Sequence, residues 1–156
     1  MLERIVYVSR AAPGTRLEAV FGIIREAHAA NAKAGLTGGL IFLDGGFVQV
    51  LEGPRAPLAA AFARIARDRR HEAVELRARE RALCRLFQGQ AMALRTRACL
   101  DPALLEGFGY RPGFPVERFP ADVLVEFAVG ACRWTAAGGF SRTAAGAAAG
   151  GRARGL

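Results

Sequence analysis

The sequence predicts an α+β fold of the ferredoxin-like type, βαββαββ, with two helices on one face of a mixed five-stranded sheet. Short stretches rich in β-branched and aromatic residues alternate with two longer stretches of helical periodicity. Turns that contain glycine or proline separate these stretches. A chain of 156 residues, 52% of them hydrophobic, is long enough to form one domain with a packed core.

The chain begins with a predicted strand and a predicted helix. Residues 3–10 are β-branched and aromatic, and strand alternation places Tyr7 on the same face as its second neighbours. Thr15 and Glu18 have the spacing of a capping box, so the helix is predicted to begin there. Apolar residues at helical spacing continue to about Asn31, where we expect the helix to end.

The next two predicted strands form a hairpin. Residues 36–43 are followed by Asp44-Gly45-Gly46, a tight-turn sequence, and by a strand that ends at Gly53-Pro54. Within this strand Gln49 lies on one face among apolar neighbours. A buried amide without hydrogen-bond partners costs about 1–3 kcal/mol. We therefore expect Gln49 to be hydrogen-bonded, and its amide can join a donor and an acceptor on different neighbours.

The second half of the chain contains the remaining elements. The pattern predicts a helix over 56–67, strands over 74–81 and 90–95, and an amphipathic helix over 121–134 that covers the free face of the sheet. Residues 136–156 are rich in glycine and alanine and predict a disordered tail. The predicted parts are a domain at 1–95, a helical extension or cap at 96–135, and the tail at 136–156.

Charge and cysteine content restrict the class of protein. The net charge of +8 favours a polyanionic partner, but the arginines are spread along the chain, which indicates a solvated basic surface. Cys84, Cys99 and Cys132 are too widely spaced for a disulfide framework or a zinc site, so we expect reduced thiols and no metal. No run of 18 apolar residues and no signal-peptide pattern occurs, which predicts a cytoplasmic protein without membrane association.

One group of polar residues is predicted to surround a cavity between the helices and the sheet. Tyr7 and Gln49 lie on strands that are central neighbours in this fold, and Asn31 ends the first helix. The remaining members are Arg70, His71 and Met92, the last of them if the fifth strand joins beside the first. A phenol, two amides, a thioether and a guanidinium suit a flat heteroaromatic ligand, and the group contains no nucleophile–base pair.

Five stretches within about residues 1–95 form a pattern in which the spacing between them is also characteristic. They are Ile5-Val6-Tyr7-Val8-Ser9-Arg10-Ala11, Asn31 with Leu36-Thr37-Gly38, Phe47-Val48-Gln49-Val50-Leu51-Glu52-Gly53-Pro54, Arg64-Ile65-Ala66-Arg67-Asp68 with Arg70-His71, and Phe87 with Met92. This pattern resembles the BLUF domain, a flavin-binding blue-light sensor. One departure is Gln90, because many BLUF domains have tryptophan two residues before the methionine.

The resemblance implies a cofactor and a role for each residue. FAD would bind non-covalently between the two helices, and Gln49 would bridge Tyr7 and the N5/O4 edge of the flavin. Asn31 would hold the pyrimidine side, Arg70 and His71 would lie near the rim, and Met92 would pack near Gln49. Blue light would drive electron and proton transfer from Tyr7 through Gln49, and the rearranged hydrogen bonds would signal to a partner protein.

The resemblance therefore implies a photoreceptor rather than an enzyme, with an unidentified downstream signalling protein and possible homo-oligomer formation. The helix near 121–134 and the fifth strand are the expected output surface. One alternative is a basic ferredoxin-like module that binds nucleic acid without flavin, although its strands lack the exposed aromatic pairs of such modules. Another is a flavin-dependent oxidoreductase, which lacks a visible substrate or nicotinamide site.

Overall fold

The computed structural model describes residues 1–112 and 116–133. Its strands and helices confirm the predicted βαββαββ order. The strands are β1 (Leu2–Ala11), β2 (Thr37–Leu43), β3 (Gly46–Pro54), β4 (His71–Arg81) and β5 (Ala93–Thr96). The α-helices are α1 (Leu17–Lys33), α2 (Arg55–Ala66), α3 (Pro102–Gly107) and α4 (Ala121–Arg133). The last residue of the helix predicted over 121–134 and the predicted tail at 136–156 lie outside the described residues.

The five strands form one mixed sheet in the order β4-β1-β3-β2-β5. All neighbouring pairs are antiparallel except β2 and β5, which are parallel. Strands β1 and β3 are central neighbours, as predicted. The fifth strand does not join beside the first; it lies at the edge beside β2, with Leu40 opposite Leu94.

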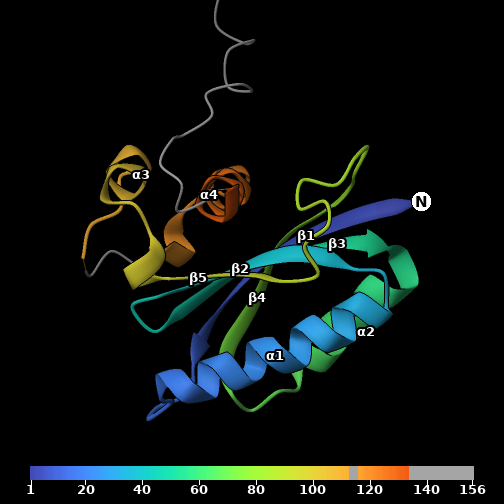
Figure 1. Ribbon diagram of the computed structural model, residues 1–156, viewed down its shortest axis with the longest axis horizontal. Coiled ribbons are helices and arrows are strands. Elements are labelled where there is room, and N and C mark those ends of the chain that lie inside the picture. The colour runs from blue at the N-terminus through green and yellow to red at the C-terminus, as the bar shows by residue number, and fades with distance from the viewer. Residues whose placement is uncertain (113–115, 134–156) are drawn as a thin grey trace, which may run out of the picture.

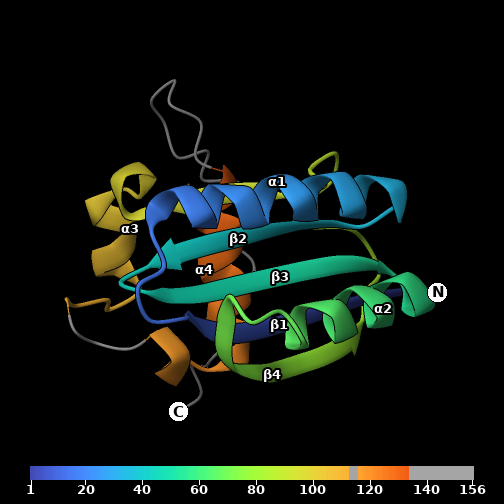
Figure 2. The same ribbon diagram turned by 90° about the horizontal axis from the view of Figure 1, so that it is seen from below.

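Helices cover both faces of the sheet (Figure 1). Figures 1 and 2 show α1 and α2 on one face, and α3 and α4 on the other. Strand alternation decides which side chains enter each layer: Tyr7 and Phe47 pack beneath α1 and α2, whereas Val48 and Val50 pack beneath α4. The helix over 121–134 was predicted to cover the free face, and α4 does so with Leu124 and Phe127 buried beneath it.

The hairpin between β2 and β3 forms as predicted. Asp44 and Gly45 both have positive φ, at 50° and 78°, which is the backbone of a type I′ turn. This turn fixes the register so that Leu40 faces Gln49.

Two local predictions were wrong. The capping box at Thr15 does not form, because the Thr15 hydroxyl donates to the Ala12 carbonyl at 2.5 Å and α1 begins later, at Leu17. The fifth strand begins at Ala93 rather than at residue 90, because the chain before it is still turning: Gly89 has a φ of 77°. Met92 therefore lies just before β5. None of the described helices is long and apolar enough to cross a membrane.

Candidate functional site

Tyr7 and Gln49 form a pair at the centre of the sheet. They are direct cross-strand partners on β1 and β3, and both side chains point toward α1 and α2. Tyr7 is 0% exposed and Gln49 is 3% exposed. The Tyr7 hydroxyl donates a hydrogen bond to Oε1 of Gln49. The amide of Gln49 was expected to have a hydrogen-bond partner, and that partner is the phenol of Tyr7 on the neighbouring strand.

The amide of Gln49 makes a second contact, with Met92. Its Nε2 donates to Sδ of Met92 at 3.3 Å, so the amide joins the phenol to the thioether. An NH₂ group carries two hydrogens, so one N–H of Gln49 stays available to a ligand. Met92 was expected near Gln49, and it reaches this position from the chain that precedes β5 rather than from a strand beside β1.

Asn31 lies in the last turn of α1, with 2% of its surface exposed. Its Nδ2 donates to the carbonyl of Ala91 at 3.0 Å, and its own carbonyl accepts from the backbone N–H of Leu36 at 2.9 Å. Helix α1 is therefore tied to the chain just before Met92. The second N–H and the side-chain carbonyl of Asn31 remain as capacity for a ligand.

Arg70 is held at the mouth of the site by two carboxylates. Its guanidinium donates to both oxygens of Asp68, at 2.7–3.1 Å, and to Glu26 on α1 at 2.8 Å. These hydrogen bonds lower the pKa of Asp68 and of Glu26, so both carboxylates stay charged at neutral pH. Glu26 was missed by sequence analysis, because a single acidic residue on an exposed helix face gives no signal.

His71 is the first residue of β4 and is only 8% exposed. Its Nδ1 lies 2.9 Å from Oγ of Ser9, and its ring packs against Phe47 with centroids 4.7 Å apart. Burial lowers the pKa of His71, and the negative charge of Asp68 opposes this effect only in part. The sequence contained the signal for Ser9, because strand alternation puts it on the face of Tyr7.

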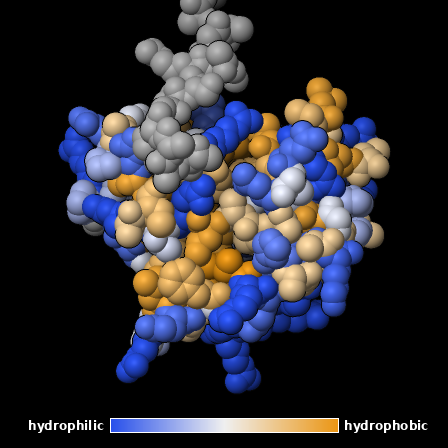
Figure 3. All heavy atoms as spheres, in the orientation of Figure 1, coloured by the Kyte–Doolittle hydropathy of each residue, from blue (hydrophilic) through white to orange (hydrophobic). Residues whose placement is uncertain are grey.

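These residues surround one cavity of about 960 Å³ between α1, α2 and the sheet. Tyr7, Asn31, Gln49, Arg70 and His71 all line it; Met92 stands behind Gln49. Its size lies within the range of small-molecule and cofactor sites. The mouth also carries Arg64, Arg67 and Arg69, which are exposed. Figure 3 shows hydrophilic side chains along the α1 edge of the molecule, with hydrophobic ones between them.

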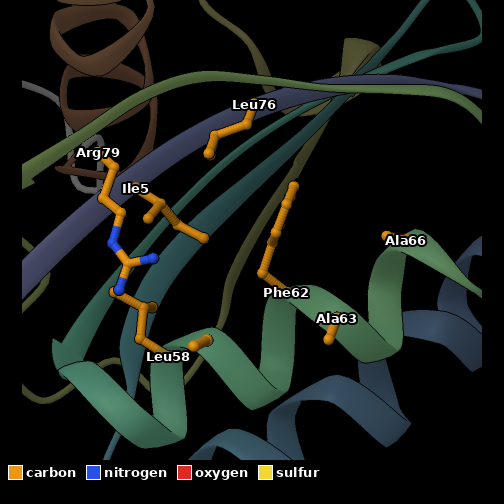
Figure 4. A pocket seen from close by; sticks show the side chains of 8 residues that line it. Ile5, Leu58, Phe62, Ala63, Ala66, Leu76 and Arg79 are labelled. Atoms are coloured by element: carbon orange, nitrogen blue, oxygen red, sulfur yellow. The ribbon is translucent and has the colours of Figure 1, made fainter.

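Phe62 packs against Tyr7 from α2. Its ring lies 5.5 Å from that of Tyr7, and its other side borders a smaller apolar cavity of about 210 Å³ between α2 and β4. Figure 4 shows Phe62 pointing from α2 toward the sheet, where Ile5 and Leu76 complete the wall. Phe62 thus shields the phenol of Tyr7 from water on this side. The sequence placed Phe62 only within the helix predicted over 56–67.

Gln90, the departure from the family pattern, is not among the residues that line the large cavity. Its backbone carbonyl accepts from Gly38 at 2.9 Å, while its side-chain Oε1 is buried and has no hydrogen-bond partner among the described residues. A second amide is therefore present two residues before Met92, with an acceptor that is not used.

The donor set fits a flavin. The cavity has apolar side chains such as Ile23 and Leu40 in its lining and presents the free N–H of Gln49 and the amide of Asn31, which match a flat ring system with alternating donors and acceptors. A redox-active phenol lies directly behind the amide.

The chain belongs to the BLUF family, sensors of blue light using FAD, whose family model matches residues 2–93. Among curated relatives, the photoactivated adenylate cyclase subunit alpha-like protein FB of Euglena gracilis is 41% identical over 71 residues. That match covers 45% of this chain and 7% of the relative. The photoactivated adenylate cyclase subunit beta of Euglena longa is 38% identical over 71 residues, 45% of this chain and 8% of the relative. The chain thus spans a small part of these relatives' length.

Solved structures show the same fold. BlrB, a BLUF protein in its dark state, superposes with a TM-score of 0.62 at 29% identity, over 67% of this chain and 82% of that chain. A bacterial light-regulated adenylyl cyclase gives 0.64 at 26% identity, over 69% of this chain and 31% of that chain. The photo-activated state of BlsA gives 0.76 at 22% identity, over 86% and 97%, a likeness in fold that extends into the C-terminal helices.

Proposed function

We propose that this protein is a blue-light photoreceptor that binds FAD non-covalently and signals by contact with another protein. The observation that carries the proposal is the chain of contacts from Tyr7 through Gln49 to Met92, which begins at the wall of the cavity. The proposed binding residues are Tyr7, Asn31, Gln49, Arg70, His71 and Met92.

The ring system would be held by hydrogen bonds and packing alone. The free N–H of Gln49 would donate to the N5/O4 edge of the flavin, and the amide of Asn31 would hold the pyrimidine side. Arg70 is already paired with Asp68 and Glu26. Its side chain is therefore held in place at the rim of the cavity, and its positive charge is largely neutralised by the two carboxylates. Arg64, Arg67 and Arg69 have no ion-pair partner among the described residues and are free to face the diphosphate of FAD.

The residues of the chain account for a switch. Bound flavin would supply the absorption of blue light and the acceptor for one electron and one proton. Tyr7 gives up an electron and its phenolic proton, Gln49 relays the proton, and both return within the cycle, so no net redox change remains. What persists is a changed tautomer or rotamer of Gln49. An amide suits this role because it exchanges donors and acceptors without carrying charge.

The change at Gln49 can reach α4 through β5. Met92 directly precedes β5, and Arg95 within β5 donates to the carbonyls of Ala131 and Cys132 at 3.0 and 3.2 Å. These carbonyls belong to the last turn of α4, where helix carbonyls lack partners within the helix. A shift of β5 therefore changes a contact that holds the end of α4, and we propose this helix and β5 as the output surface.

The switch is tested by Gln49→Leu, which removes the amide but keeps a similar volume. We expect this variant to bind flavin and to lose the light-induced red shift of the flavin bands. Tyr7→Phe should behave in the same way. The matched controls are Gln88→Leu at an exposed position and Tyr110→Phe in the other layer, both of which should keep the shift. A normal shift in Gln49→Leu would contradict the proposed switch.

A further inference from the structure

Glu52 is a fully buried carboxylate that the proposed switch does not use. It lies on β3, three residues beyond Gln49, and is 0% exposed. Arg4 on β1 and Thr37 on β2 are its two cross-strand neighbours. Nε of Arg4 donates to Oε1 at 2.8 Å and the hydroxyl of Thr37 donates to Oε2 at 3.2 Å. The charge of Glu52 is thus compensated inside the sheet.

The same carboxylate also binds the backbone of the chain between β4 and β5, residues 82–92, which we call the connector. The N–H of Leu86 donates to both oxygens of Glu52, at 2.9 and 3.0 Å, and the N–H of Phe87 donates to Oε2 at 3.1 Å. A carboxylate that accepts several hydrogen bonds in a buried site holds its donors firmly. Figure 1 draws the connector in yellow-green on the side of the sheet where α4 lies.

The connector joins the two layers of the molecule. Phe87 is buried in the layer beneath α4, and a Cβ placed on Gly39 would lie 2.6 Å from its ring and 2.7 Å from Sγ of Cys132. Five residues later Met92 is buried in the layer beneath α1 and α2, against Gln49. Between these points Ala91 accepts from Asn31 and Gln90 accepts from Gly38.

We propose that Glu52 is a positioning residue for the light switch: it holds the connector so that Met92 and the Ala91 carbonyl stay against Gln49 and Asn31. Arg85 supports this clamp from outside, because its guanidinium donates to the Glu52 carbonyl at 3.0 Å and to the Gly35 carbonyl at 2.8 Å. Since β3 carries both Gln49 and Glu52, one strand fixes the amide and the thioether that it contacts. This inference rests on the proposed function for its effect on the photocycle.

The test observes Met92 directly. The chain has two methionines, and the other, Met1, is 76% exposed. Selective ¹³C labelling of methionine methyl groups in the flavin-loaded full chain therefore gives two assignable NMR signals, with Met1 as an internal reference. The variants are Glu52→Gln, which keeps the length but replaces one acceptor oxygen by NH₂, and Glu52→Asp, which keeps the charge but shortens the reach. Glu80→Gln is the control, because it removes the exposed carboxylate partner of Arg4.

We expect both Glu52 variants to shift and broaden the Met92 signal in the dark toward the position of an exposed methionine, while Glu80→Gln leaves it unchanged. The rate of thermal return from the lit state to the dark state should fall about fivefold or more, because Met92 is no longer held in its dark-state position against Gln49. An unchanged Met92 signal in a folded Glu52 variant, or an unchanged or faster return, would overturn the proposal.

If neither Glu52 variant folds, Arg85→Met loosens the connector from a half-buried position, and an unchanged Met92 signal there overturns the clamp. If the protein binds flavin but shows no light-induced shift, the proposed function fails. The dark-state Met92 signal still decides whether Glu52 positions the connector.

Discussion

At the scale of the residue, Tyr7 is set up as a neutral donor. Complete burial raises the pKa of its phenol above the usual 10.0, and the negative charge of Asp68 adds to this effect. The hydroxyl therefore keeps its proton throughout the range in which proteins are normally handled. The proton that the proposed switch would use is thus held on Tyr7, where the hydroxyl donates to Oε1 of Gln49.

This raised pKa predicts a specific loss of stability in alkali. Above a pH of about 10 the unfolded chain releases the Tyr7 proton while the folded chain keeps it, so the free energy of unfolding falls as pH rises. Urea unfolding between pH 8 and 11 should show a steeper decline for the wild type than for Tyr7→Phe. Tyr110→Phe serves as the control for losing a tyrosine. Equal slopes for the wild type and Tyr7→Phe would show that burial does not hold the proton.

At the scale of the element, the central hairpin and the two helices could be predicted, but the edge of the sheet could not. Strand alternation and the Asp44-Gly45 turn are local signals, and they placed Tyr7 beside Gln49 correctly. Strand β5 follows the connector, which is bound to residues far away in the sequence through contacts of Glu52 and Arg85. No local pattern reports such contacts. For the same reason Met92 was predicted near Gln49 only if the fifth strand joined beside the first, whereas it reaches Gln49 from the chain before an edge strand.

The glycines of β2 give a prediction for this element. A Cβ on Gly38 would lie 2.2 Å from the backbone oxygen of Val50, so the two strands would have to separate. We expect Gly38→Ala to lower the free energy of unfolding by about 2 kcal/mol or more. Gly22→Ala, in α1 with nothing within 4 Å, should instead raise it by about 0.5–1 kcal/mol. Urea denaturation measures both, and equal stability of the two variants would contradict the packing described for β2.

At the scale of the whole molecule, the two helical layers differ in what they contain. The α1 and α2 layer holds the cavity, and the α4 layer receives the end of β5 and the connector. The chain has a net charge of +8, and part of its positive charge is concentrated at one site. Arg64, Arg67 and Arg69 all lie at the mouth of the cavity. A basic surface that sequence analysis could only describe as solvated thus has a local role to test.

That role predicts a preference for FAD over riboflavin that weakens with salt. Replacing Arg64, Arg67 and Arg69 by glutamine should weaken FAD binding about tenfold at low ionic strength and leave riboflavin binding unchanged. The charge-matched control replaces Arg81, Arg111 and Arg133, which are exposed and do not line the cavity. Calorimetric titration with both flavins measures the effect. The same loss for riboflavin would mean that the arginines act on folding of the cavity rather than on the diphosphate.

The central claim is that light absorbed in this cavity rearranges the hydrogen bonds of Gln49. The most direct measurement is the absorption spectrum of the purified, FAD-reconstituted protein before and after blue light. We expect flavin bands that move slightly to the red and return in the dark, with Gln90 in place of the usual tryptophan. Flavin bands that do not move under blue light would contradict the switch, and a protein that takes up no flavin would contradict the cofactor site itself.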